Sequence, residues 1–185
     1  MSTALLVIDT QMAFVARRDA GHPWANPDAD ARIAALLAAF RAKDLPVLHV
    51  LHHGQDPRDD FHADSPGAQV QPAAAPLPGE PVFIKHGSSA FMGTGLADHL
   101  TAHGITGLVI AGGAANYCVE SSTRMASDLG YTTTVVGDAL INFGQTLRDG
   151  RRVPAGDVLA LTLANLDGEF AHVAVTNEIL TQIAT

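Results

Sequence analysis

Short apolar runs alternate with helix-like segments along most of this chain. Runs without internal polar alternation are typical of parallel strands that are buried on both faces. We expect such strands at Leu5–Asp9, Leu45–Leu51, Pro81–Ile84, Gly107–Ala111, Tyr131–Val136 and Ala171–Val175. Helices are expected between or after them at Asp28–Lys43, Thr94–His103, Asn116–Leu129, Pro154–Leu166 and Glu178–Ile183. The alternation predicts an α/β fold with a mostly parallel sheet covered on both faces by helices.

Size and charge narrow the possible classes of protein. The 185 residues fit a single domain, 1–185, and 47% hydrophobic content is enough for a substantial core. The formal net charge of −8 argues against a nucleic-acid partner, which would need a basic face. No apolar run reaches membrane-spanning length, and the N-terminus lacks the features of a signal peptide. A single cysteine excludes an internal disulfide, and we expect a cytoplasmic protein.

Three chemically active side chains stand at or just beyond predicted strand ends. Asp9 closes the first strand, Lys85 follows the third, and Cys118 follows the fourth across a turn rich in small residues. Because parallel sheets form their sites beyond the carboxyl ends of the strands, these side chains should meet at one edge. A carboxylate, an ammonium and a thiol would supply a base, a counter-charge and a nucleophile for acyl transfer through a thioester.

Each of these residues also has a purely structural interpretation. Cys118 would feel the positive end of a helix dipole, which favours thiolate, but it could instead be a small buried hydrophobe. Asp9 could be a turn former, and Lys85 could be a lysine whose stem packs at a strand end. The case for chemistry therefore depends on the three lying together.

Ordered motifs around these positions resemble the isochorismatase-like hydrolases, which include nicotinamidases, N-carbamoylsarcosine amidases and ureidoacrylate amidohydrolases. The resemblance spans nearly the whole chain. Its motifs are Asp9-x-Gln11-x-x-Phe14 after an apolar strand, Lys85 followed by Ser89-Ala90-Phe91-x-x-Thr94-x-Leu96, Gly112-x-x-x-x-x-Cys118-Val119, Gly130-Tyr131 and Asp138-Ala139.

The resemblance implies a fold and a set of roles. It implies a three-layer α/β/α fold around a six-stranded, mostly parallel sheet, often assembled into homo-oligomers such as dimers or tetramers. It makes Asp9 the general base, Lys85 its partner and Cys118 the nucleophile. It further implies a cis peptide at Gly113–Ala114 that aims the N–H groups of Ala114 and Cys118 into an oxyanion hole.

One departure from the resemblance concerns metal binding. Nicotinamidases place an Asp and two His after the second strand to hold a metal, whereas this chain has His52 and His53 there and lacks the Asp-x-His spacing. His52, His53 and His62 could form a different kind of metal site, or they could line the pocket or face solvent. We expect a metal-free hydrolase without a cofactor.

The substrate walls should come from aromatic residues beside the triad. The candidates are Phe14, Phe91, Tyr117 and Phe143, each of which could instead be core packing. His22 and Trp24 follow the first strand and could reach the site, whereas Arg151 and Arg152 are expected on the surface or at a subunit contact. The long segment His52–Gly79 lacks periodicity and should shape specificity.

The sequence thus predicts a hydrolase that cleaves a C–N bond of a small amide, ureido or carbamoyl compound. Two alternatives stay open: a vinyl-ether hydrolase of the isochorismatase type, and a catalytically silent relative that acts in binding or assembly. Retention of Cys118 argues against the first and the intact triad against the second.

Overall fold

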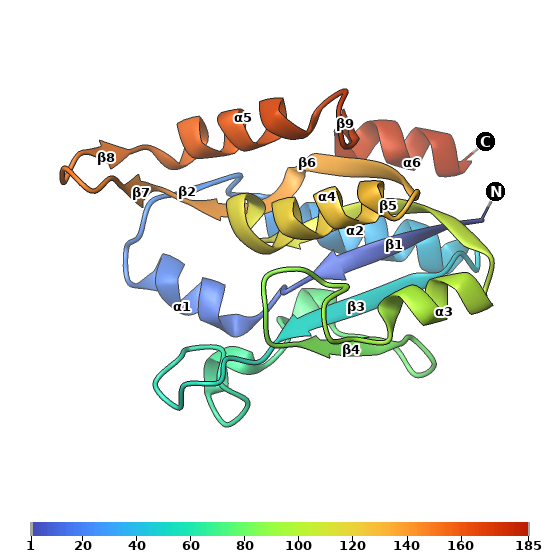
Figure 1. Ribbon diagram of the computed structural model, residues 1–185, viewed down its shortest axis with the longest axis horizontal. Coiled ribbons are helices and arrows are strands. Elements are labelled where there is room, and N and C mark those ends of the chain that lie inside the picture. Colours follow the sequence, from blue (N-terminus) through green and yellow to red (C-terminus); the bar gives the residue numbers. More distant parts are fainter. Residues whose placement is uncertain (1, 185) are drawn as a thin grey trace.

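The computed structural model describes residues 2–184, so both end residues of the expected 1–185 domain lie outside it. Within this range the main sheet has seven strands (Figure 1). Six are parallel, in the spatial order β9, β6, β5, β1, β3, β4. Their bounds are β1 (Ser2–Ile8), β3 (Val47–His52), β4 (Val82–Lys85), β5 (Ile105–Gly113), β6 (Thr132–Phe143) and β9 (His172–Ala174). The expected six-stranded parallel sheet is confirmed.

Helices cover both faces of this sheet, which gives the expected three layers (Figure 1). Helices α2 (Ala29–Ala42) and α6 (Thr176–Ala184) pack on one face. Helices α3 (Leu96–Ala102), α4 (Glu120–Asp128) and α5 (Ala155–Leu166) pack on the other. Among the described residues, no helix is both long enough and apolar enough to cross a membrane.

Strand β1 shows how the sequence builds these layers. Its Leu5 and Val7 side chains enter the core cluster beneath α2, and Leu6 and Ile8 enter the cluster beneath α3–α5. Successive side chains of a strand point to opposite faces, so a central strand with a helix layer on each side must be apolar at every position. All four of these side chains are buried, as the uninterrupted apolar run predicts.

Several short elements were not predicted. Helix α1 (Met12–Asp19) follows β1, and β2 (Trp24–Ala25) pairs antiparallel with the last residues of β6. Strand β6 continues to Phe143 rather than ending at Val136, and β7 (Gln145–Thr146) pairs with β8 (Arg152–Val153) in a separate hairpin. Figure 1 shows α1, β2 and this hairpin extending beyond the carboxyl ends of β1 and β3.

The long segment after β3 is ordered by hydrogen bonds to Gln11. The Gln11 amide nitrogen donates to the carbonyls of His52 and Ala68, and its side-chain oxygen accepts from the His52 N–H. Two short 3₁₀ turns, Pro66–Ala68 and Pro72–Ala74, lie in this segment. Gln11 is fully buried, so this amide fixes the start of the segment beside the end of β1.

A second polar cluster lies at the start of β3. Its His49 ring is almost fully buried, and Nε2 lies 2.8 Å from the Glu80 carboxylate. Arg41 donates two hydrogen bonds, of 2.7 and 2.8 Å, to the two oxygens of Glu80. Burial alone would raise the pKa of Glu80, but these bonds and one from the Leu77 N–H lower it to about 2.

Candidate active site

Asp9, Lys85 and Cys118 converge at the carboxyl edge of the sheet. Asp9 directly follows β1, Lys85 is the last residue of β4, and Cys118 lies in a π-helical turn, Ala115–Val119, between β5 and α4. Lys85 Nζ lies 2.7 Å from Asp9 Oδ2 and 3.1 Å from Cys118 Sγ. It also donates to the Gly87 carbonyl at 3.1 Å. One ammonium group therefore contacts both the carboxylate and the thiol.

Lysine is suited to this position because of the strand order. Strand β3 lies between β1 and β4, and Lys85 is in register with His52 of β3. The lysine must therefore reach across a neighbouring strand to meet Asp9, a task for a long, flexible stem. Lys85 is 0% exposed and Asp9 is 1% exposed, so each charge depends on the other to offset its desolvation.

Burial sets the protonation of the site. It raises the pKa of Asp9 above its ordinary value, even though the Lys85 charge opposes that rise. Burial and the neighbouring Asp9 charge raise the pKa of Cys118 to about 12, with Lys85 opposing them. The resting side chain at 118 is therefore a neutral thiol.

The protonated thiol corrects the expectation that the helix dipole would favour thiolate at Cys118. Helix α4 begins at Glu120, so the cysteine precedes its first turn, and the π-helical turn holds it half-buried beside a carboxylate. Dipole effects amount to about 0.3–1 kcal/mol at an exposed helix end. Desolvation together with a buried like charge exceeds that.

Two glycines allow β5 to approach its neighbours before the cysteine. Gly112 has φ +114°, and a Cβ there would lie 2.0 Å from the Ile8 carbonyl oxygen. A Cβ on Gly113 would lie 2.8 Å from the Phe14 ring. The Gly113–Ala114 peptide bond is cis. The oxyanion-hole role of the Ala114 and Cys118 N–H groups stays a prediction.

The predicted aromatic residues divide into two groups. Phe14 is buried with its ring centroid 5.2 Å from that of Phe61 and 5.9 Å from that of Phe143. It therefore lies between Gly113 and Phe143, the last residue of β6. Phe91 is buried on the α3–α5 face and stacks on Tyr131, so its assignment to the substrate pocket is replaced by core packing.

Tyr117 and Phe143 contact residues on the side of the site where the β7–β8 hairpin and β2 lie. Tyr117 is 52% exposed, and its hydroxyl donates to the Gln145 side-chain oxygen at 3.1 Å. Phe143 is partly buried and stacks on Trp24, with ring centroids 6.5 Å apart.

His52 is the last residue of β3, in register with Lys85, and His53 follows it. The His52 ring meets the Phe61 ring edge-on, with 5.7 Å between centroids, and its Nδ1 is buried without a hydrogen-bond partner in the described structure. The His53 carbonyl lies 2.8 Å from Nδ1 of His86. Across residues 2–184, no group of three His, Cys, Asp or Glu side chains is arranged to hold a metal ion, and His62 joins none.

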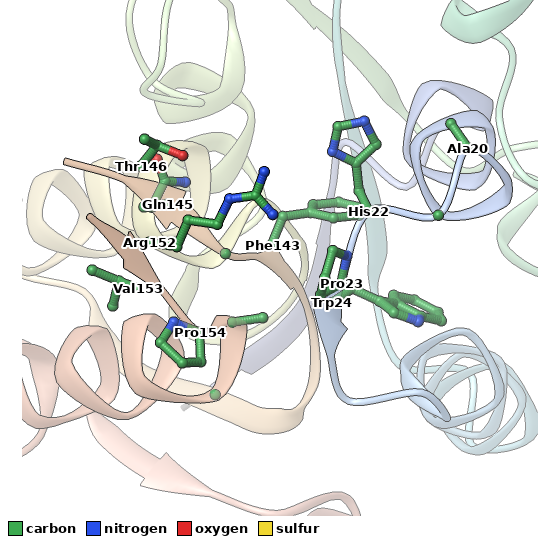
Figure 2. Close-up of a pocket in the computed structure, with 14 residues that line it drawn as sticks. Ala20, His22, Pro23, Trp24, Phe143, Gln145, Thr146, Arg152, Val153 and Pro154 are labelled. Carbon is green, nitrogen blue, oxygen red and sulfur yellow. The ribbon is translucent and has the colours of Figure 1, made fainter. Parts of the chain in front are cut away.

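An open pocket of about 760 Å³ lies beyond the carboxyl end of β6 (Figure 2). Its walls are residues 20–24, 143–146 and 152–156. Phe143, Trp24 and His22 were named from the sequence. Arg152, expected on the surface or at a subunit contact, is exposed and also belongs to this lining. Gln145 was not predicted, because nothing in the sequence indicated the β7–β8 hairpin that carries it.

Comparison with known proteins identifies relatives over the whole fold. The family model described as "Isochorismatase domain" matches residues 3–150. The uncharacterized isochorismatase family protein YddQ of Bacillus subtilis is 34% identical over 182 residues, which cover 97% of this chain and 99% of that protein. N-carbamoylsarcosine amidase of an Arthrobacter species is 27% identical over 180 residues, covering 86% of this chain and 64% of the amidase.

Solved structures agree with the sequence relatives. A crystal structure of an isochorismatase-family protein from Chromobacterium violaceum superposes with a TM-score of 0.93 at 38% identity. The match covers 99% of this chain and 94% of that one. Together with the family-model match across most of the chain, this likeness confirms the resemblance drawn from the motifs: the chain belongs to the isochorismatase family of hydrolases.

Proposed function

We propose that this protein is a cysteine-dependent hydrolase that cleaves a C–N bond of a small amide, ureido or carbamoyl compound through a thioester. The observation that carries the proposal is the single buried ammonium of Lys85, which contacts both the Asp9 carboxylate and the Cys118 thiol. A nucleophile, a base and a counter-charge are thereby held in contact, with the base and the counter-charge buried. Similarity to an N-carbamoylsarcosine amidase supports a C–N bond as the target.

The first half-reaction forms the thioester. Asp9 accepts the thiol proton as Cys118 Sγ bonds to the carbonyl carbon, and the carbonyl π electrons move to oxygen. Asp9 Oδ1 suits this role because it is buried and has no hydrogen-bond partner among the described residues. The intermediate then collapses, the C–N bond breaks, and the proton held by Asp9 passes to the departing nitrogen.

The second half-reaction restores the enzyme. Water attacks the thioester carbon while Asp9 accepts one of its protons. The C–S bond breaks, the acid leaves, and the proton returns to sulfur. Lys85 stabilises negative charge first on Asp9 and then on sulfur, from a position held by its bond to the Gly87 carbonyl.

An ammonia- and amine-release screen over small amides, ureido acids and carbamoyl compounds tests the proposal. We expect turnover by the native enzyme and loss of turnover in Cys118→Ala, with a Ser127→Ala variant at the far end of α4 as the matched control. Mass spectrometry of quenched enzyme should show an acyl adduct on the peptide that contains Cys118. Normal hydrolysis by a folded Cys118→Ala protein would contradict the nucleophile assignment.

Assembly and location stay predictions. A homo-oligomer, dimer or tetramer, is expected from the family resemblance, and light scattering on the purified full chain would test it. A cytoplasmic location is expected from the single cysteine and would be tested by cell fractionation.

A further inference from the structure

The pocket beyond β6 is unusual for so acidic a chain because its lining contains no Asp or Glu. The sequence carries 19 acidic residues against 11 Lys and Arg. The lining instead includes Arg152, His22 and the uncharged polar side chains of Gln145 and Thr146. A concave surface that carries a permanently charged guanidinium and no carboxylate attracts anions locally, even on a protein of negative net charge.

Arg152 is also free to bind a ligand. Seven of the nine arginines lie within 4.0 Å of a carboxylate oxygen in the described structure; Arg148 and Arg152 are the two that do not. Figure 2 shows the Arg152 side chain extending from β8 across the pocket toward Phe143 and His22. A guanidinium presents a planar fork of donors that matches a carboxylate.

The opposite wall of the pocket suits an apolar body. Trp24 and Phe143 stack with 6.5 Å between ring centroids, and both line the pocket. Aromatic walls combined with a few placed polar groups are typical of small-molecule sites, and about 760 Å³ is an ordinary volume for one. The combination selects a ligand with an apolar part and an anionic end.

Two contacts connect this pocket to the thiol. The Phe143 ring packs on Phe14, which in turn packs against Gly113 at the end of β5. Gln145 accepts a hydrogen bond from Tyr117, the residue before Cys118. The pocket lining therefore contacts the residue before Cys118 directly through Gln145, and it reaches the end of β5 through Phe14.

The geometry points to this pocket as the subsite for the carboxylate end of the substrate, with Arg152 as its binding residue and Trp24 and Phe143 beside its apolar part. The inference rests on the proposed function and narrows the substrate class to amides or carbamoyl compounds that also carry a carboxylate. Neutral amides of the same size should be poor substrates.

Binding can be measured without turnover because Trp24 is the sole tryptophan. In Cys118→Ala protein, phenylacetate should change the Trp24 fluorescence saturably, whereas the uncharged isostere phenylacetamide should bind at least about tenfold more weakly. Adding Arg152→Gln should weaken phenylacetate binding about tenfold or more. Arg148→Gln is the matched control because Arg148 is the other arginine without an ion pair and lies outside the pocket lining. Adding this change instead should leave phenylacetate binding unchanged. Equal binding of both probes, or no effect of Arg152→Gln, would overturn the inference.

Hydrolysis separates this inference from the proposed function. The substrates are ω-carbamoyl carboxylates with two to five methylenes between the groups, each paired with the alkyl amide of equal length. Arg152→Gln should raise KM about tenfold or more for the best carboxylate substrate and leave its neutral partner unchanged. Hydrolysis without that discrimination overturns the subsite and leaves the proposed function standing. If phenylacetate binding depends on Arg152 but no amide is hydrolysed, the proposed function is wrong and the anion site still stands.

Discussion

Replacing Asp9 by Asn should make Cys118 more reactive toward an alkylating agent while it strongly slows hydrolysis. The native carboxylate is one cause of the raised pKa of Cys118, and burial is the larger cause. Asparagine keeps nearly the same shape but carries no charge. Lys85, which lies 3.1 Å from the sulfur, would then have the thiolate as its anionic partner.

The size of the effect follows from the geometry. Lys85 Nζ lies 2.7 Å from Asp9 Oδ2 and 3.1 Å from Cys118 Sγ, so the oxygen and the sulfur are at most about 5.8 Å apart. At an effective dielectric constant of about 20, two charges at that separation repel by about 3 kcal/mol. Removing the carboxylate charge should therefore lower the pKa of Cys118 by about 2 units, at 1.36 kcal/mol per unit.

The expected change in rate is smaller than the change in ionisation. A pKa lower by 2 units raises the thiolate fraction about 100-fold at neutral pH. The thiolate of lower pKa is a weaker nucleophile, with a Brønsted slope of about 0.4–0.5, so alkylation should accelerate about tenfold. Hydrolysis should fall by about 10²–10⁴-fold, the usual contribution of a general base.

The assay is the rate of iodoacetamide incorporation by mass spectrometry across pH 6–10. Cys118 is the sole cysteine, so whole-protein mass reports that site directly. Asp64→Asn is the matched control because its side chain is 94% exposed and it makes the same chemical change. If Asp9→Asn labelled no faster than the native protein at every pH, the electrostatic account of the site would be refuted.

Three further substitutions and one control substitution test stability. Lys85→Met leaves the buried Asp9 carboxylate without its counter-charge and should cost about 3–5 kcal/mol in urea unfolding; an unchanged midpoint would contradict the pairing. Gly112→Ala drives a Cβ to 2.0 Å from a β1 carbonyl oxygen and should cost more than about 2 kcal/mol. Gly156→Ala is the control: the added Cβ would have no atom within 4 Å, so the substitution should not destabilise the protein. Glu80, whose pKa is lowered from 4.5 to about 2, stabilises the fold above pH 4.5 and loses that contribution as pH falls toward 2. The difference in unfolding free energy between the native protein and Glu80→Gln should therefore shrink at low pH. A difference that stays constant with pH would contradict the stabilising role of the Glu80 ion pairs.

The long elements of the fold could be predicted because their patterns reflect burial directly. The last five residues of β1, Ala4 to Ile8, are buried beneath the helix layers, so an uninterrupted apolar run was sufficient to identify the strand. Strands β2, β7 and β8 have two residues each, too few for any periodicity, and their conformation follows from the partners they pair with. Helix α1 carries Arg17 and Arg18 in its last turn and buries only Ala13 and Phe14, so its apolar face is too narrow to show in sequence.

The position of the triad could be predicted for a similar reason, whereas its surroundings could not. Parallel strands end at one edge, so polar residues at three strand ends must lie close together. The pocket beyond β6 depends on the β7–β8 hairpin, which carries Arg152, and no local sequence signal specifies that hairpin. Burial of Phe91 likewise depends on its stacking with Tyr131, which is distant in the sequence.

The protonation of Cys118 is the property that depends most on three-dimensional context. A helix start in the sequence favours thiolate, but in the structure burial and the Asp9 charge outweigh it and hold the sulfur as a thiol. Because the carboxyl is the weaker proton acceptor of the two, moving the proton to Asp9 before attack is uphill. The free energy of this proton transfer is offset only when sulfur bonds to a carbonyl carbon and hydrogen-bond donors stabilise the new oxyanion. In the proposed mechanism the nucleophile is therefore generated and consumed in the same step, and binding of the substrate carbonyl beside the sulfur activates the thiol.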